Sequence, residues 1–150
     1  MTGIRWSVGV VTLVLLAATP VSAQQTSVAG RIKTVSGSAF IVRDRAMIPA
    51  KPGQEVFEAD AIRTGADGSV GVTLKDDTRL ALGPSSEVRL DHFVYVPGDG
   101  SFGLAVKFVR GVTAYVSGRM AKLAPDSIRL ETPAAIIGVR GTTLAIRVEP

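Results

Sequence analysis

Short runs of β-branched and aliphatic residues, separated by turn-forming residues, constrain the fold of this chain most strongly. Ala39-Phe40-Ile41-Val42 is one such run, and Gly65-Ala66-Asp67-Gly68 is one such turn. The runs recur at spacings of about eight to twelve residues, which is typical of sandwiches, barrels and rolls. We therefore predict an all-β domain of about ten to thirteen short strands, most simply a β-sandwich or roll. Only residues 118–124 have a pattern that suits a helical turn.

A local repeat of eight residues lies between residues 70 and 90. Its equivalent positions are Val72, Leu80 and Val88. Short strands alternating with turns suit a tight antiparallel meander, in which one face of the sheet is buried. The same spacing suits the sides of a β-solenoid, and three copies do not decide between the two. Ahead of the repeat, residues 43–54 are predicted to form the longest early loop, because Pro49 and Pro52 oppose a central strand there.

The amino end has the three parts of a secretory signal peptide. Arg5 provides a positive charge, residues 8–18 form an apolar stretch, and Val21-Ser22-Ala23 offers the small residues that a signal peptidase requires. We predict a helical signal peptide over residues 1–23, cleaved between Ala23 and Gln24.

An uncleaved membrane anchor is the alternative for this segment. Its apolar stretch is shorter than the ~20 residues that a spanning helix requires, and Pro20 interrupts it. Cleavage would leave an all-β domain over residues 27–150. A domain of this size buries about two-thirds of the surface that its unfolded chain exposes, so it needs no disulfide.

Composition excludes several classes of function. The chain has no cysteine, which rules out thiol catalysis and thiolate metal sites. Beyond the signal peptide, 16 Lys and Arg residues stand against 13 Asp and Glu residues, a formal charge of +3. The basic residues are spread along the whole sequence, and this distribution argues against a nucleic-acid partner.

Catalytic and metal-binding groups are sparse. His92 is the only histidine, and its neighbour Asp91 would lie on the opposite face of a strand, so the two cannot form a catalytic pair. We expect no enzyme activity and no cofactor, with a small hydrolase using His92 as the alternative. Asp67, Asp76 and Asp77 could hold calcium if their turns stacked, but they are typical turn residues, so no metal site is predicted.

The last twenty residues carry the most distinctive motif. They include Thr132-Pro133-Ala134-Ala135-Ile136-Ile137-Gly138-Val139-Arg140-Gly141-Thr142. Pro133 favours an extended start, and the apolar residues after it predict two strands broken at Gly138 and Gly141. Arg140 lies between these glycines. We predict that Arg140 pairs with Asp60 or Asp77 and joins the last strands to the earlier sheet. Alternatively, Arg140 faces a groove and receives an anionic ligand or a partner's carboxylate.

This motif resembles the terminal signature of the FecR domain, whose pattern is close to T-P-x-A-x-x-G-V-R-G-T-x-F-x-V. Only the Phe position departs, because Leu144 stands there. The resemblance extends from about Gly30 to Val148. At the turn where family members usually have Asp-Gly-Thr, this chain has Asp76-Asp77-Thr78, although a left-handed position would suit glycine better.

The resemblance implies a compartment more strongly than an activity. FecR regulators have a cytoplasmic anti-sigma segment, one membrane helix and a periplasmic domain that senses an outer-membrane transporter. Because residues 1–23 resemble an export signal, the cytoplasmic role is not expected here. We expect a periplasmic or secreted, non-enzymatic module that binds an envelope protein or glycan in sensing or signalling. We expect no nucleic-acid partner and no stable membrane insertion after cleavage. The alternative is a structural protein that forms homo-oligomers through its sheet edges.

Overall fold

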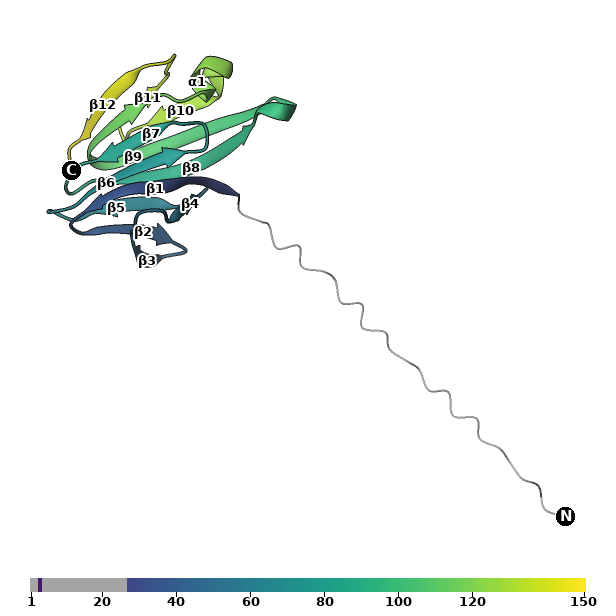
Figure 1. The fold of residues 1–150 in the computed structure, drawn as a ribbon, viewed down its shortest axis with the longest axis horizontal. Helices are drawn as coiled ribbons and strands as arrows, with labels where there is room; N and C mark the ends of the chain where they lie inside the picture. Colours follow the sequence, from purple (N-terminus) through teal and green to yellow (C-terminus); the bar gives the residue numbers. More distant parts are fainter. Residues whose placement is uncertain (1–2, 4–26) are drawn as a thin grey trace.

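The computed structural model describes residue 3 and residues 27–150 (Figure 1). The predicted signal peptide and its cleavage site at Ala23 and Gln24 lie outside these residues. The strands are β1 (Val28–Ser36), β2 (Ala39–Arg43), β3 (Ala46–Pro49), β4 (Glu55–Phe57), β5 (Ala61–Thr64), β6 (Ser69–Leu74), β7 (Arg79–Leu82), β8 (Glu87–Val96), β9 (Ser101–Val116), β10 (Ile128–Glu131), β11 (Ile136–Ile137) and β12 (Thr143–Val148). The helical elements are η1 (Pro97–Asp99), α1 (Met120–Leu123) and η2 (Pro125–Ser127).

The strands form one sheet of 12 strands that curls into a half-barrel, which confirms the all-β prediction. The main path through the sheet is β3-β2-β5-β8-β9-β7-β6-β1-β4. Strands β10 and β12 both pair with β9, and β11 pairs with β10. All pairs are antiparallel except β9 with β10, so the chain forms a roll rather than the stacked parallel strands of a solenoid.

Strand β9 is the longest strand, and it pairs with β7 and β8 one after the other. Strand β7 pairs with the second half of β9, and β8 pairs with the first half. Leu82 at the end of β7 lies opposite Thr113, and Glu87 at the start of β8 lies opposite Arg110. Strands β6 and β5 run past β7 and β8 in the same way, and β1 and β2 run past β6 and β5. The strand pairs β7 and β8, β6 and β5, and β1 and β2 therefore each form one long line beside β9, with a turn that interrupts the line between the two strands of each pair.

The interruptions lie side by side and form a crease across the sheet. They are Gly37-Ser38, the turn at residues 65–68, the turn at residues 83–86, and Gly111 within β9. Backbone hydrogen bonds join them: Gly65 N donates to Ser38 O at 2.8 Å, and Ser85 N donates to Gly65 O at 2.9 Å. Gly111 has φ of +81°, and a Cβ there would lie 2.2 Å from Ser86 Oγ. Only glycine at position 111 permits β9 to approach the turn at residues 83–86 this closely.

Bulges keep the same face of the long strands buried on both sides of each irregularity. In β9, Leu104, Val106 and Phe108 are buried before the bend, whereas Thr113 and Tyr115 are buried after it. The buried positions thus change from even to odd numbers, which one extra residue in a strand produces. The register of β8 with β9 shifts between Glu87 and Val88 and again between Leu90 and His92.

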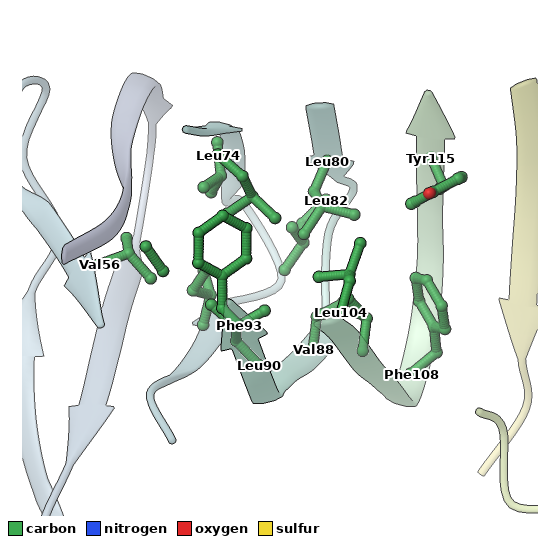
Figure 2. Packing of buried hydrophobic residues seen from close by; sticks show 14 of the residues in the cluster. Val56, Leu74, Leu80, Leu82, Val88, Leu90, Phe93, Leu104, Phe108 and Tyr115 are labelled. Atoms are coloured by element: carbon green, nitrogen blue, oxygen red, sulfur yellow. The ribbon is translucent and has the colours of Figure 1, made fainter. Parts of the chain in front are cut away.

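The two parts of the curled sheet enclose one hydrophobic core, which runs from Ala29 to Ile146. Figure 2 shows side chains of β6, β7, β8 and β9 meeting between the strands. The largest fully buried members include Tyr115, Phe108, Ile32, Leu104 and Leu130. Burying one such aliphatic or aromatic side chain stabilises the fold by about 1.5–3 kcal/mol relative to leaving it exposed.

Two local expectations need correction. The segment predicted as a long loop contains β3. Within residues 27–150, β3 pairs with β2 and no other strand, so it forms an edge where Pro49 is tolerated. The repeat of eight is a hairpin only between β6 and β7. After β7 the chain does not turn back but crosses the crease into β8, since both strands pair with β9.

Candidate functional site

The signature segment begins with a turn that joins β10 to β11. The Thr132 hydroxyl accepts hydrogen bonds from the backbone N–H groups of Ala134 and Ala135, at 3.3 and 3.1 Å. The Thr132 N–H in turn donates to Ala135 O at 2.8 Å. Pro133 fits inside this turn because it has no N–H to satisfy. Thr132 and Pro133 therefore set the direction in which the chain enters β11.

The second part of the signature is anchored on both sides of Arg140. Val139 is 3% exposed, so it is part of the core. Thr142 N donates to Ser117 Oγ, and Ser117 N donates to Thr142 O, each at 3.1 Å. Gly141 has φ of +64°, a left-handed conformation that glycine adopts without strain. These contacts hold Arg140 on an exposed loop between β11 and β12.

The structure corrects the partners predicted for Arg140. Asp60 pairs with Arg43, with Nη2 2.7 Å from Oδ2, and Asp77 pairs with Arg119, with Nε 2.9 Å from Oδ2. Within the described part of the chain, Arg140 takes part in no ion pair. Charge alone did not identify the partners, because the register of the strands decides which cation reaches each carboxylate. The Arg140 side chain is exposed to solvent.

The turn between β6 and β7 contains a buried polar cluster centred on Asp76, which we call the hub; it comprises Asp76, Thr78 and the backbone N–H groups of Arg119 and Met120. Asp76 is fully buried, and its carboxylate accepts hydrogen bonds from Thr78 N, Thr78 Oγ1 and Met120 N at 3.1, 2.8 and 3.3 Å. Its backbone oxygen accepts a hydrogen bond from Arg119 N at 2.6 Å. The hub therefore joins the β6–β7 turn to the start of α1. Gly118 lies against the turn, and only hydrogen fits at its Cα.

Asp77 occupies the position where the family pattern has glycine, and its φ is +68°. This left-handed conformation costs an L-residue about 1–2 kcal/mol. We expect Asp77→Gly to raise the free energy of unfolding by about 0.5–1 kcal/mol, because glycine removes the strain at some entropic cost. The lost ion pair with Arg119 matters little, since both side chains are exposed. Urea unfolding checks this, with Asp77→Ala as the control that loses the ion pair and keeps the strain.

A basic hollow of about 400 Å³ lies next to the hub and the signature loop. Its lining is Thr73, Asp77, Arg79, Ser117, Gly118, Arg119 and Lys122. Ser117 links the hollow to the loop, because it bonds Thr142. Asp77 already pairs with Arg119, so Arg79 and Lys122 provide unbalanced positive charge. The hollow can therefore attract an anionic group, with Ser117 and Thr73 as hydroxyl partners.

A second polar cluster surrounds Asp60, which is 1% exposed. Arg43 donates to both carboxylate oxygens, at 2.8 and 2.7 Å, and Phe57 N donates to Oδ2 at 2.9 Å. The guanidinium also lies 4.5 Å above the centre of the Phe57 ring. Its hydrogen bond with Asp60 raises the pKa of Arg43. This bidentate pair ties the end of β2 to the turn before β5, so its role is structural.

His92 has the carboxylate partner that the sequence did not identify. Its Nδ1 lies 3.2 Å from Glu58 Oε2, and the ring is about half exposed. The other side of the ring covers Gly103, where a Cβ would lie 2.7 Å from Nε2. A catalytic nucleophile would have to approach Nε2. The ring atoms therefore fill the space above β9, which suits a packing role.

Among the described residues, no group of three or more histidine or carboxylate side chains is placed to bind a metal. Asp76 is occupied by its hydrogen bonds, and Asp77 by Arg119.

Tyr115 should impose a pH dependence on stability. Its side chain is fully buried, and its hydroxyl has no hydrogen-bond partner among the described residues. Burial raises the pKa of Tyr115, and the nearby Asp76 carboxylate raises it further. Between the pKa of about 10 that tyrosine has in the unfolded chain and its raised pKa in the folded protein, the unfolded chain loses this proton first, so the free energy of unfolding falls as the pH rises through that interval.

We expect Tyr115→Phe to remove that part of the decline. Urea unfolding at pH 9 and at pH 11 measures it, with Tyr95→Phe as the control because Tyr95 is only partly buried. An equal decline in wild-type protein and in Tyr115→Phe would contradict the assignment.

Residues 60–150, more than half of the chain, match the family described as FecR protein. The chain belongs to the FecR family. No curated protein and no solved structure matches it. The FecR match contains the hub, the whole lining of the basic hollow, and the whole signature. It begins at Asp60, so β1–β4 lie outside it, although they contribute buried residues such as Ile32 and Val56 to the same core.

The FecR family is generally regulatory and sensing, non-enzymatic, and associated with the cell envelope. Within the described residues, no helix has the length and apolar character that crossing a membrane requires. The sequence located the signature but missed the cations of the basic hollow. Arg79 directly follows Asp76-Asp77-Thr78, and Arg119 follows Gly118 after β9, but only the pairing of β7 with β9 brings these two cations to the same hollow.

Proposed function

We propose that this protein is an exported, non-enzymatic FecR module that binds an envelope protein or glycan through its signature loop, in a sensing or signalling role. One observation carries the proposal. The signature anchors Val139 in the core and bonds Thr142 to Ser117, yet leaves Arg140 between them exposed and without an ion pair in the described part. A loop held this firmly presents a guanidinium at low entropic cost, which favours recognition of a carboxylate or phosphate.

The absence of cysteine permits a sharp test of this proposal. A single cysteine at Ala134, an exposed residue of the signature, can carry a photo-activated crosslinker that labels nothing else in the chain. We expect crosslinking in intact cells to capture a discrete partner. Adding Arg140→Glu in the same background should reduce capture at least tenfold, because it reverses the charge that the partner meets.

Met47→Cys provides the matched control. Met47 is 50% exposed on β3, which ends the main path of the sheet, whereas β11 and β12 lie off that path beside β10 and β9. Capture of the same partner from both positions, or capture that Arg140→Glu leaves unchanged, would reject the signature loop as the binding site.

Export is tested separately. The proposal requires the protein to be periplasmic or secreted, with Gln24 as the first residue after removal of residues 1–23. Mass spectrometry of fractionated cells gives the amino-terminal residue directly. A full-length chain in the cytosol would reject export, and a full-length chain in the membrane would favour the uncleaved anchor.

A second candidate is assembly through sheet edges. Among the described residues, β12 pairs with β9 alone, and Ile136 on β11 is 63% exposed. Exposed strand edges can pair with another chain. Arg147 on β12 is exposed and acts against such pairing, since charged residues on edge strands discourage it. Light scattering over a range of concentrations decides: a strict monomer would reject this candidate.

A further inference from the structure

Cations gather on the outer face of β1, β6 and β7, away from the core. Arg31 lies opposite Thr73, and Thr73 lies opposite Arg79, so the three side chains form one row across the strands. Neighbouring strands are about 4.8 Å apart, which places the backbones of Arg31 and Arg79 about 10 Å from one another. Lys33 and Lys75 are exposed next to this row.

Two adjoining hollows follow this face. One is the basic hollow beside α1, and the other, of about 440 Å³, is lined by residues that include Arg31, Lys33, Glu55 and Lys75. Thr73 and Asp77 line both, so the two hollows adjoin at these residues. We call their cations the basic strip. Its members are Arg31, Lys33, Lys75, Arg79, Arg119 and Lys122.

The charge of the strip is unbalanced. Its two carboxylates are both in ion pairs, Glu55 with Arg31 at 3.1 Å and Asp77 with Arg119 at 2.9 Å. Four cations of the strip have no ion pair within the described residues; they are Lys33, Lys75, Arg79 and Lys122. Six cations against two carboxylates give the strip a charge of +4, more than the +3 of residues 27–150 together. The strip can therefore attract an anion.

The lining indicates what kind of anion fits. The exposed large hydrophobic residues of the described chain are Met47, Val96, Val112, Leu123 and Ile136, and none of them lines either hollow. A surface that docks on a membrane uses such residues to enter the lipid, and a protein interface uses them as anchors. A hollowed strip with spaced cations and the hydroxyls of Thr73 and Ser117 instead suits a flexible linear chain that carries repeated negative charges and hydroxyl groups.

We propose that the basic strip binds a linear acidic polysaccharide, whose carboxylates pair with the unbalanced cations. This inference rests on the proposed function, because it assigns a ligand class to the exported module. The polymer lies across β1, β6 and β7 and reaches α1, where Arg119 and Lys122 end the strip. Binding weakens as salt is raised, because most of the attraction is between exposed charges.

Polygalacturonate is the probe, and binding to the purified protein is measured by calorimetry at low and at high salt. We expect wild-type protein to bind it and not to bind neutral dextran. Lys75→Glu with Arg79→Glu should weaken binding at least tenfold. The matched control is Lys51→Glu with Arg147→Glu, which changes the net charge equally at exposed positions outside the strip. It should change binding by less than threefold. Circular dichroism with thermal unfolding verifies that both variants are folded.

Several outcomes would overturn the inference. An equal loss in both double variants would mean that net charge alone drives binding. Tighter binding to vesicles with anionic lipid, or to single-stranded DNA, than to polygalacturonate would mean that the strip serves another class of partner. No binding to polygalacturonate at low salt would also reject it.

The inference and the proposed function can fail independently. If the strip variant binds polygalacturonate normally while Arg140-dependent crosslinking persists, the strip proposal fails, and the proposed binding of a partner through the signature loop still stands. If the strip binds polygalacturonate but no capture depends on Arg140, the signature loop is not the partner site.

Discussion

Gly118→Ala is expected to lower the free energy of unfolding by about 3 kcal/mol. A Cβ at this position would lie 2.3 Å from both Asp76 O and Thr78 N, which are backbone atoms of the hub. The turn would have to move, and the buried Asp76 carboxylate would then lose its hydrogen bonds to Thr78 and Met120. Urea unfolding followed by circular dichroism measures the loss.

Gly98→Ala is the matched control, because nothing lies within 4 Å of the Cβ that it adds. We expect it to change stability by less than about 0.5 kcal/mol. Similar stability of the two variants would show that the hub is not closely packed and would contradict the arrangement of α1 on the β6–β7 turn.

Arg43→Met is expected to cost about 3 kcal/mol, because it leaves the buried Asp60 carboxylate without its cation. Of the groups that donate hydrogen bonds to the Asp60 carboxylate in the described residues, Phe57 N at 2.9 Å is the one that remains. The control is Arg89→Met, whose pair with Asp91 is exposed to solvent and should contribute less than about 1 kcal/mol. Chemical unfolding of both variants at the same pH gives the comparison.

A double variant separates the ion pair from general disruption. Arg43→Met with Asp60→Leu removes both charges, so much of the stability lost in Arg43→Met should return. If the double variant is less stable than Arg43→Met alone, the uncompensated charge of Asp60 is not the source of the cost.

Local patterns in the sequence were sufficient for the fold class and for most strands. Turn residues such as Gly65 and Gly83 marked strand ends correctly, and the helical turn within residues 118–124 is confirmed as α1. The length of β9 could not be predicted in this way. Gly111 is a residue type that often ends or bends a strand, and in the structure it forms a bend inside β9, which depends on its contact with Ser86.

The candidate site was predictable only in part, because it depends on register. The signature indicated that Arg140 is special, but its predicted partners were wrong, since Arg43 and Arg119 reach Asp60 and Asp77 instead. The basic residues are spread along the sequence, yet antiparallel pairing brings Arg31 and Arg79 into one row on one face. Spacing along a chain does not reveal such a row until the pairing of the strands is known.

The free energy of unfolding of Arg140→Met, compared with wild-type protein in urea, tests most directly whether the FecR signature presents its arginine rather than burying it. Because Arg140 is exposed and has no ion pair in the described part of the chain, we expect a difference below about 0.5 kcal/mol. A loss of about 2 kcal/mol or more would mean that the guanidinium holds the last strands to the sheet, and it would contradict the outward-facing loop.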